Sequence, residues 1–132
     1  MGEAMIVAGV GCRKGASVHD IIAVIDAALL RAGLAQAELA LIATPTFKAE
    51  ERGIAAAASA RGVPLTIIAE AELEAAGARA VTNSQRVLAL TGLPSVAEAA
   101  ALAAGGPNAR LLGPRTALGP ATCALAVLEQ AP

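Results

Sequence analysis

The apolar run Ala4-Met5-Ile6-Val7-Ala8 leads directly into the glycine-rich stretch Gly9-Val10-Gly11-Cys12-Arg13-Lys14-Gly15, and a helical pattern opens at Ser17. A strand, a glycine-rich turn and a helix N-terminus form an anion site, because glycines let backbone N–H groups approach a ligand and the helix end carries partial positive charge. Arg13 and Lys14 add two full charges. We therefore expect an anion-binding turn, whose ligand-binding candidates are Gly9, Gly11, Cys12, Arg13 and Lys14.

The spacing of these glycines argues against a nucleotide as the anion. Gly-x-Gly-x-x-x-Gly is one residue longer than the dinucleotide fingerprint, and the Gly-Lys-Ser/Thr ending of a phosphate-binding loop is absent. An acidic residue at the end of the second strand would favour a dinucleotide ribose, but the chain has Thr44-Pro45 there.

Length and composition limit the possible domain organisation and the possible binding partners. The chain has 132 residues, of which 56% are hydrophobic, and a formal net charge of −1. This length predicts one domain over residues 1–132 with a substantial core. The near-neutral charge favours neither nucleic acid nor an anionic membrane. With no Trp, no Tyr and 1 Phe, the chain also lacks the aromatic platforms on which single-stranded bases stack.

The cysteines and the N-terminal residues indicate in which cellular compartment the protein is expected. Cys12 and Cys123 lie far apart without metal-ligand spacing, so we expect two reduced thiols, no metal site and no cofactor. Met1-Gly2-Glu3-Ala4 lacks the basic region of a signal peptide, and no apolar run approaches the roughly 20 residues of a membrane span. The expected location is cytoplasmic.

Hydrophobic periodicity predicts strands that alternate with helices. The expected strands lie near residues 4–9, 39–43, 64–68, 109–112 and 121–128. The expected helices begin at Ser17, Ala49, Glu70, Ser84 and Ser95 and end at Arg31, Arg61, Ala76, Gly92 and Ala104, respectively. Ser17, Gly33 and the capping box Ser95-Val96-Ala97-Glu98 are typical helix-end signals.

The order of these elements predicts the topology. Three strand–helix–strand units indicate a largely parallel sheet. The gap from Gly113 to Pro120 is too short for a crossover helix, so the last two strands should be antiparallel if they are neighbours. The expected fold is therefore α/β: a three-layer α/β/α arrangement around a mixed, mostly parallel five-stranded sheet, with the last strand antiparallel.

Polar residues gather at the predicted strand ends. Open α/β sheets bind ligands beyond the carboxyl ends of their parallel strands. The polar residues that follow these ends are Cys12, Arg13, Lys14, Thr44, Thr46, Lys48, Glu50, Glu51, Arg115 and Thr116. Because guanidinium groups pair carboxylates bidentately, we expect a polyanionic or polycarboxylate ligand in one cleft. The alternative is that these are ordinary solvated loop charges, which contribute little to stability.

A catalytic group is harder to assign. Glu50 or Glu51 could act as a general base near Lys48, and because adjacent helical residues point in different directions, at most one of them should face the cleft. The single histidine, His19, follows the expected helix cap and is expected at the surface. Cys12 could be a nucleophile at a helix N-terminus, although a packed thiol is the commoner case.

Helix capping explains several other polar residues. Ser84, Ser95 and Glu98 fit helix N-termini, with ligand contact as the alternative. Thr122 is expected in the last strand, near the mouth of the cleft. Ser95 and Thr122 are therefore kept as ligand-binding candidates, together with Thr44, Lys48, Glu50 and Arg115; Lys48 and Glu50 are the catalytic candidates.

Five segments together resemble a known family. They are Gly9-Val10-Gly11-Cys12-Arg13-Lys14-Gly15, Thr44-x-x-x-Lys48-x-Glu50, Thr91-Gly92-Leu93-Pro94-Ser95-Val96-Ala97-Glu98-Ala99-Ala100-Ala101-Leu102, Ala109-Arg110-Leu111-Leu112-x-Pro114-Arg115 and Ala121-Thr122-x-Ala124-x-Ala126. The chain resembles, from about residue 4 to residue 128, the CobE and CbiG C-terminal family of cobalamin biosynthesis, and is most similar to its stand-alone CobE form.

The resemblance implies an α/β/α fold and a place in corrin-ring synthesis. In that family, the two-part CbiG protein opens the ring-A lactone of a cobalt-precorrin and releases acetaldehyde, whereas the stand-alone CobE form belongs to the aerobic route. Arg115 stands where the family usually has Lys, and Ala16-Ser17 where it commonly has Thr. An arginine keeps the charge but would not transfer a proton as an amine does, which weakens a catalytic role there.

Three function hypotheses of different classes follow. The first is a binding protein that holds or transfers a precorrin or corrin intermediate and assists other cobalamin-pathway enzymes. The second is a hydrolase that opens a precorrin lactone, in which Glu50 or Glu51 positions water and Lys48 stabilises the oxyanion. The third is a generic nucleotide-binding domain. The expected partner is a tetrapyrrole with carboxylates around an apolar ring, and neither nucleic acid nor a membrane.

Overall fold

The computed structural model describes residues 4–46, 51–83, 96–106, 108–113 and 115–129. Its strands are β1 (Ala4–Cys12), β2 (Leu39–Pro45), β3 (Leu65–Ile68), β4 (Ala109–Leu111), β5 (Thr116–Leu118) and β6 (Ala121–Glu129). Its helices are α1 (Val18–Ala32), the 3-10 turn η1 (Gln36–Glu38), α2 (Arg52–Arg61), α3 (Glu70–Asn83) and α5 (Val96–Gly105). None of the described helices is long and apolar enough to cross a membrane.

The sheet has the order β3-β2-β1-β6-β4, and β5 also pairs with β6. β1, β2 and β3 are mutually parallel, whereas β6 is antiparallel to β1, β4 and β5. β4 pairs with residues 126–128 and β5 with residues 121–123, so the two short strands follow one another along the outer edge of β6. The expected mixed, mostly parallel sheet with an antiparallel last strand is confirmed.

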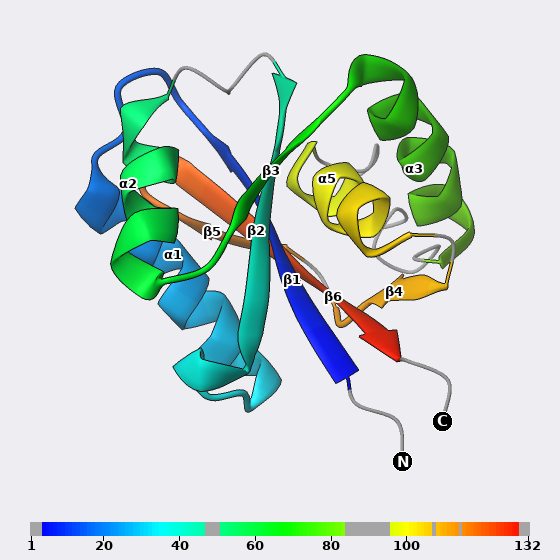
Figure 1. Ribbon diagram of the computed structural model, residues 1–132, viewed down its shortest axis with the longest axis horizontal. Coiled ribbons are helices and arrows are strands. Elements are labelled where there is room, and N and C mark those ends of the chain that lie inside the picture. The colour runs from blue at the N-terminus through cyan, green and yellow to red at the C-terminus, as the bar shows by residue number, and fades with distance from the viewer. Residues whose placement is uncertain (1–3, 47–50, 84–95, 107, 114, 130–132) are drawn as a thin grey trace.

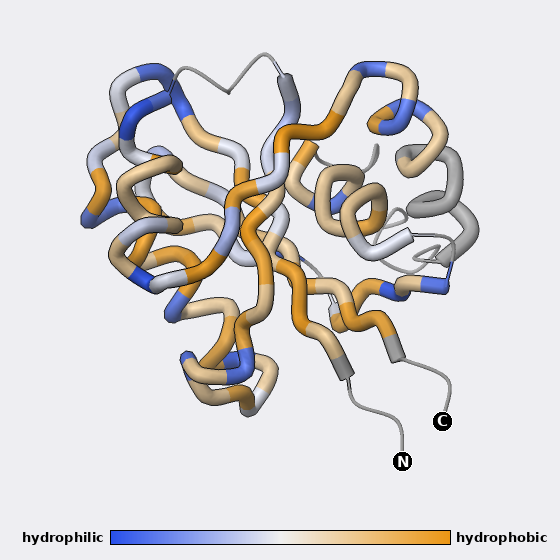
Figure 2. Tube along the Cα trace, viewed as in Figure 1, coloured by the Kyte–Doolittle hydropathy of each residue, from blue (hydrophilic) through white to orange (hydrophobic). Residues whose placement is uncertain are grey.

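Helices cover both faces of this sheet. α1 and α2 lie on one face, and α3 and α5 lie on the other (Figure 1). Successive residues of β1 alternate between the two layers: Ile6, Ala8 and Val10 face the α1 side, and Val7 faces the α5 side. Hydrophobic residues follow the central strands, and hydrophilic ones gather at turns and helix ends (Figure 2). The expected three-layer α/β/α arrangement is therefore present.

Local signals explain how α1 begins and ends. The Ser17 hydroxyl accepts a hydrogen bond from Asp20 N, and the Asp20 carboxylate accepts one from Ser17 N, so a capping box is present. Gly33 ends the helix in the left-handed conformation, with φ of 73°. The expected cap at Ser17 and stop at Gly33 are both confirmed.

Several elements differ from the expected ones, among them α2, which begins at Arg52 instead of Ala49 because Glu51 has an extended backbone. β1 continues to Cys12 instead of ending near residue 9, because its antiparallel pairing with β6 extends to Cys12 opposite Ala121. β5 was not expected; the turn at Gly119, which has φ of 59°, lets residues 116–118 fold back onto β6. α3 continues past Ala76 to Asn83 and packs on α5. The helix expected from Ser84 lies outside the described residues.

Gly9 lets α5 lie directly on β1. A Cβ atom at Gly9 would stand 2.6 Å from Ala101 N and 2.9 Å from Ala101 Cβ, and would also collide with the carbonyl oxygen of Ala97. Every residue of α5 from Ala97 to Leu102 is buried. The first turn of this helix therefore lies close to the end of β1, where the next glycine on the same strand face is Gly11.

Candidate functional site

A cleft of about 390 Å³ lies where β1 ends, beside the first turn of α5 and the β5–β6 hairpin. Its lining residues are Gly11, Cys12, Arg13, Val96, Ala97, Arg115, Ala117, Gly119, Pro120 and Thr122. Five of the residues expected to bind ligand are in this set, namely Gly11, Cys12, Arg13, Arg115 and Thr122. The structure brings together residues that are more than one hundred positions apart in the sequence.

Strand register forms the floor of the cleft. Gly11 pairs with Thr122 across β1 and β6, and Thr122 pairs with Ala117 across β6 and β5. Directly opposed residues in paired strands share a face, so these three form one row across the sheet. A Cβ atom at Gly11 would meet nothing within 4 Å. Gly9 therefore makes room for α5, and Gly11, two residues later, makes room for the cleft.

Positive charge converges on the cleft from three elements. The exposed Arg13 follows β1, and its backbone N–H donates to Pro120 O at 2.8 Å. Arg115 precedes β5, and its side chain is 28% exposed. Val96 and Ala97 place the first turn of α5 at the wall, where the unpaired N–H groups of a helix carry partial positive charge. Such an arrangement favours an anionic group.

The charge of Arg115 is shared with a buried carboxylate. Arg115 Nη1 lies 3.2 Å from Glu98 Oε1, and Glu98 is only 1% exposed. Glu98 was expected to cap α5 in a box with Ser95, but Ser95 lies outside the described residues. The cap therefore stays a prediction, and the contact that the structure describes for this carboxylate is with an arginine of the cleft.

The glycine turn at Gly15 binds a carboxylate of the chain itself. Gly15 N donates to Glu51 Oε1 at 2.8 Å, and Cys12 Sγ lies 4.0 Å from the same oxygen. Gly15 has φ of 82°, a left-handed conformation that favours glycine. Glu51, one of the two possible general bases, thus bridges the turn to the start of α2. Among the described residues, the anionic group that the Gly15 amide binds is therefore the side chain of Glu51 and not an external ligand.

The remaining candidates lie elsewhere or outside the described residues. Thr44 is fully buried and donates its hydroxyl to Val10 O at 2.9 Å, so it ties β2 to β1 instead of lining the cleft. Gly9 lies beneath α5, and Lys14 and His19 are exposed outside the cleft lining. Lys48, Glu50 and Ser95 lie outside the described residues, so their expected roles stay predictions.

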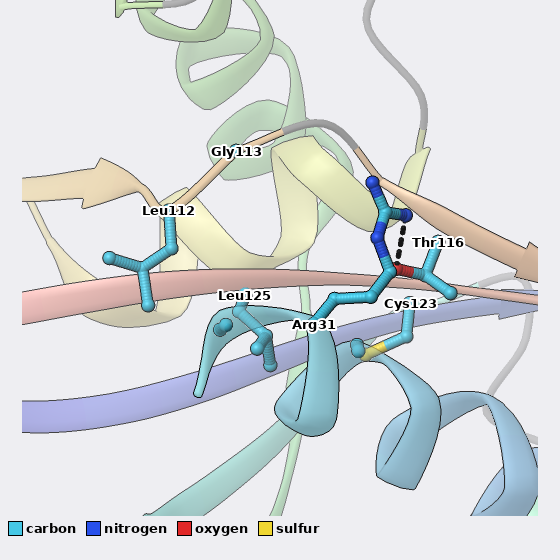
Figure 3. Close-up of a pocket in the computed structure, with 8 residues that line it drawn as sticks. Arg31, Leu112, Gly113, Thr116, Cys123 and Leu125 are labelled. Carbon is cyan, nitrogen blue, oxygen red and sulfur yellow. Dashed lines mark hydrogen bonds between the residues drawn. The ribbon is translucent and has the colours of Figure 1, made fainter. Parts of the chain in front are cut away.

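Two further cavities open on the described part of the molecule. One of about 600 Å³ lies at the carboxyl ends of β2 and β3, lined by Pro45, Thr46, Ile68, Ala69, Glu70, Leu73 and Glu74. The other, of about 140 Å³, lies between the end of α1 and β6 (Figure 3). There Arg31 Nη1 donates to Thr116 Oγ1 at 2.9 Å above Cys123 and Leu125. Neither cavity gathers the expected cationic residues.

Several residues of the cleft were not expected from the sequence. Val96 and Ala97 carry no polar group, and their place depends on how α5 crosses β1. Ala117, Gly119 and Pro120 belong to the unexpected β5–β6 hairpin. One signal that was available is the acidic residue Glu98 among alanines, because a charge on an apolar helix requires a partner.

The two thiols lie in different environments. Neither cysteine forms a disulfide in the structure; Cys123 is fully buried, and Cys12 is half-buried at the cleft. Burial raises the pKa of the Cys123 thiol to about 12. Among the described residues, no group of three or more His, Cys, Asp or Glu side chains could hold a metal ion.

A thiol reagent at mildly alkaline pH should therefore modify Cys12 and leave Cys123 unmodified until the protein unfolds. The thiolate is the reacting form, and the buried Cys123 thiol stays protonated well above neutral pH. Mass spectrometry of peptides after timed labelling, with a denatured sample as control, measures both rates. Equal labelling of the two cysteines in the folded protein would contradict this arrangement.

Comparison with known proteins agrees with the fold and the motifs. The family model "Cobalamin synthesis G C-terminus" matches residues 6–126. Protein CobE from a Sinorhizobium species is 39% identical over 121 residues, which cover 92% of this chain and 79% of that protein. The expected resemblance is thereby confirmed.

Two crystal structures are also similar. That of cobalamin biosynthesis protein chiG from Agrobacterium tumefaciens is 46% identical, with a TM-score of 0.77 and coverage of 92% of this chain and 96% of the other. That of CobE, a protein from the cobalamin (vitamin B12) biosynthetic pathway, is 36% identical, with a TM-score of 0.79 and coverage of 95% and 94%. The chain belongs to the CobE and CbiG C-terminal family of cobalamin biosynthesis proteins.

Proposed function

We propose that this protein binds a precorrin or corrin intermediate through the ligand's carboxylates, and that it holds or transfers that intermediate for other enzymes of the pathway. The observation that supports this proposal most directly is the convergence of Arg13, Arg115 and the first turn of α5 on one cleft. Membership of a cobalamin biosynthesis family supports the choice of a tetrapyrrole over other polycarboxylates.

The chemistry of the cleft suits one edge of such a ligand. Acetate and propionate groups would pair with the two guanidinium groups, which bind carboxylates in a planar, bidentate manner. The aliphatic wall formed by Val96, Ala97 and Ala117 would contact the apolar ring edge. A volume of about 390 Å³ admits the substituents of one edge, and the rest of the macrocycle would lie across the mouth.

The hydrolase hypothesis stays the alternative. Of the residues proposed to catalyse the hydrolysis, Glu51 lies in the described part of the chain, where it accepts a hydrogen bond from Gly15 N and does not line the cleft. The other candidates, Lys48 and Glu50, lie outside the described residues. Transfer to partner enzymes and a cytoplasmic location likewise stay predictions.

Replacing Gly11 with valine should weaken binding of a corrin polycarboxylate by about tenfold or more, because the new side chain fills the cleft floor (about 1.4 kcal/mol per decade). Cobyrinic acid is a suitable probe, followed by its absorbance during titration. Folding should change little, since a Cβ atom at this position meets nothing within 4 Å. Gly11→Ala, which adds only that atom, is the matched control. Absence of binding by the unmodified protein, or equal affinities of all three proteins, would contradict the proposed site.

A further inference from the structure

We propose that Glu98 is a positioning residue, which holds the guanidinium of Arg115 in the cleft so that it receives a carboxylate of the ligand. This inference rests on the proposed function and deepens it. It assigns a ligand-binding role, acting through Arg115, to a residue that does not line the cleft and for which the sequence favoured a helix cap over ligand contact.

The burial of Glu98 gives the first argument. It lies in the first turn of α5, its side chain is 1% exposed, and its neighbours Ala97 and Ala99 are buried. An ionised carboxylate in such surroundings is costly unless charged or polar groups pair with it. The helix thus holds the carboxylate at a fixed place, and Arg115, whose Nη1 lies 3.2 Å away, is held with it.

The shape of the guanidinium gives the second argument. Arginine offers several N–H donors in a rigid plane, and the contact with Glu98 engages Nη1. In the described part of the chain, Nε and Nη2 of Arg115 have no hydrogen-bond partner, and the side chain is 28% exposed at the cleft. One part of the group therefore pairs with the protein while another is available to a ligand. A lysine ammonium, a point charge without this planar fork, would not present the same geometry.

Holding Arg115 in place before the ligand arrives affects the free energy of binding. A free arginine side chain must lose rotamer freedom when it binds a carboxylate, and that loss subtracts from affinity. Because Glu98 already orders Arg115 in the unbound protein, less freedom remains to be lost. The opposing effect is electrostatic, since the negative charge of Glu98 repels an anionic ligand. Removing the charge of Glu98 therefore distinguishes the two effects. The affinity for the ligand falls if Glu98 acts mainly by positioning Arg115, and it rises if Glu98 acts mainly by repelling the ligand.

A double-mutant cycle tests the inference. Affinity for cobyrinic acid is measured at low salt for the unmodified protein, Glu98→Gln, Arg115→Ala and the double variant. We expect Arg115→Ala to lose about tenfold and Glu98→Gln to lose about fivefold, since glutamine keeps the size but not the charge of the side chain. In the Arg115→Ala background, Glu98→Gln should cause no further loss. Glu98→Asp, which keeps the charge but withdraws it by one methylene, should behave like Glu98→Gln.

The outcomes distinguish the inference from the proposed function. Higher affinity of Glu98→Gln would show simple charge neutralisation, and an equal loss in both Arg115 backgrounds would show a structural effect through α5; either result overturns the inference alone. Absence of binding by the unmodified protein overturns the proposed function as well. Melting curves identify any variant that does not fold. If both Glu98 variants are unfolded, NMR of the Arg115 guanidinium in the unmodified protein without ligand decides the matter: slow rotation of its N–H groups is expected if Glu98 fixes it, and rotation as fast as that of the exposed Arg13 would overturn the inference.

Discussion

Replacing Gly9 with alanine should lower the free energy of unfolding by about 3 kcal/mol, at the upper end of the usual cost of overpacking a core. The new Cβ atom would stand 2.6 Å from Ala101 N and would collide with the backbone of Ala97, so α5 would have to move off the sheet. For a domain whose total stability is typically about 5–15 kcal/mol, this is a large fraction. Chemical denaturation followed by circular dichroism measures the change.

Gly11→Ala is the matched control for this experiment. It makes the same chemical change two residues further along the same face of β1, where the added atom meets nothing within 4 Å. We expect a change within about 0.5 kcal/mol, as for most substitutions away from close contacts. If Gly9→Ala lost no more stability than Gly11→Ala, the close approach of α5 to β1 would be wrong, and with it the wall of the cleft.

Replacing both Arg13 and Arg115 with alanine should lower affinity for a polycarboxylate tetrapyrrole by about a hundredfold, at about tenfold for each guanidinium. The loss should shrink as salt is raised, because screening already weakens the contacts in the unmodified protein. Uroporphyrin, with an acetate and a propionate on each pyrrole ring, and coproporphyrin, in which methyl groups replace the acetates, are convenient probes. The loss should be larger for uroporphyrin.

The control for net charge is the double variant Arg13→Ala/Arg52→Ala. Arg52 is exposed in the first turn of α2 and does not line the cleft, so this variant should lose only the contribution of Arg13. Equal losses in the two double variants would show that overall charge, and not the cleft, governs affinity.

The two arginines should differ in their effect on folding. The sequence predicted that loop cations contribute little to stability, and this still applies to the exposed Arg13. Arg115 contacts a carboxylate that is 1% exposed, so its removal should cost about 1–3 kcal/mol, within the range for a buried charged group that loses a partner. That expectation is therefore revised for Arg115.

Most of the fold could be predicted because its signals are local. Apolar strand segments that alternate with amphipathic helix segments predicted a sheet covered by helices. Ser17 and Gly33 predicted the two ends of α1. The short gap before β6 predicted its antiparallel direction. The strand β5 was missed because three residues carry too little periodicity, and the length of β1 was underestimated because it depends on pairing with β6, far along the chain.

The candidate site could be predicted only in part, for a related reason. The rule that ligands bind at strand ends correctly grouped Arg13 with Arg115, but it could not tell which polar side chains the protein uses itself. Thr44 turns inward to Val10 O, because a buried hydroxyl needs an acceptor. Glu51 turns to the amide of Gly15. The place of α5, and therefore of Glu98, follows from three-dimensional packing at Gly9.

A crystal structure of the protein with cobyrinic acid tests the central claim most directly. We predict the corrin at the end of β1, with carboxylates of one ring edge within hydrogen-bond distance of Arg13 and Arg115, and with the contact between Arg115 and Glu98 intact. Density for the ligand in the cavity lined by Leu73 and Glu74, in the cavity beside Arg31, or only at the exposed Lys14 would contradict the claim.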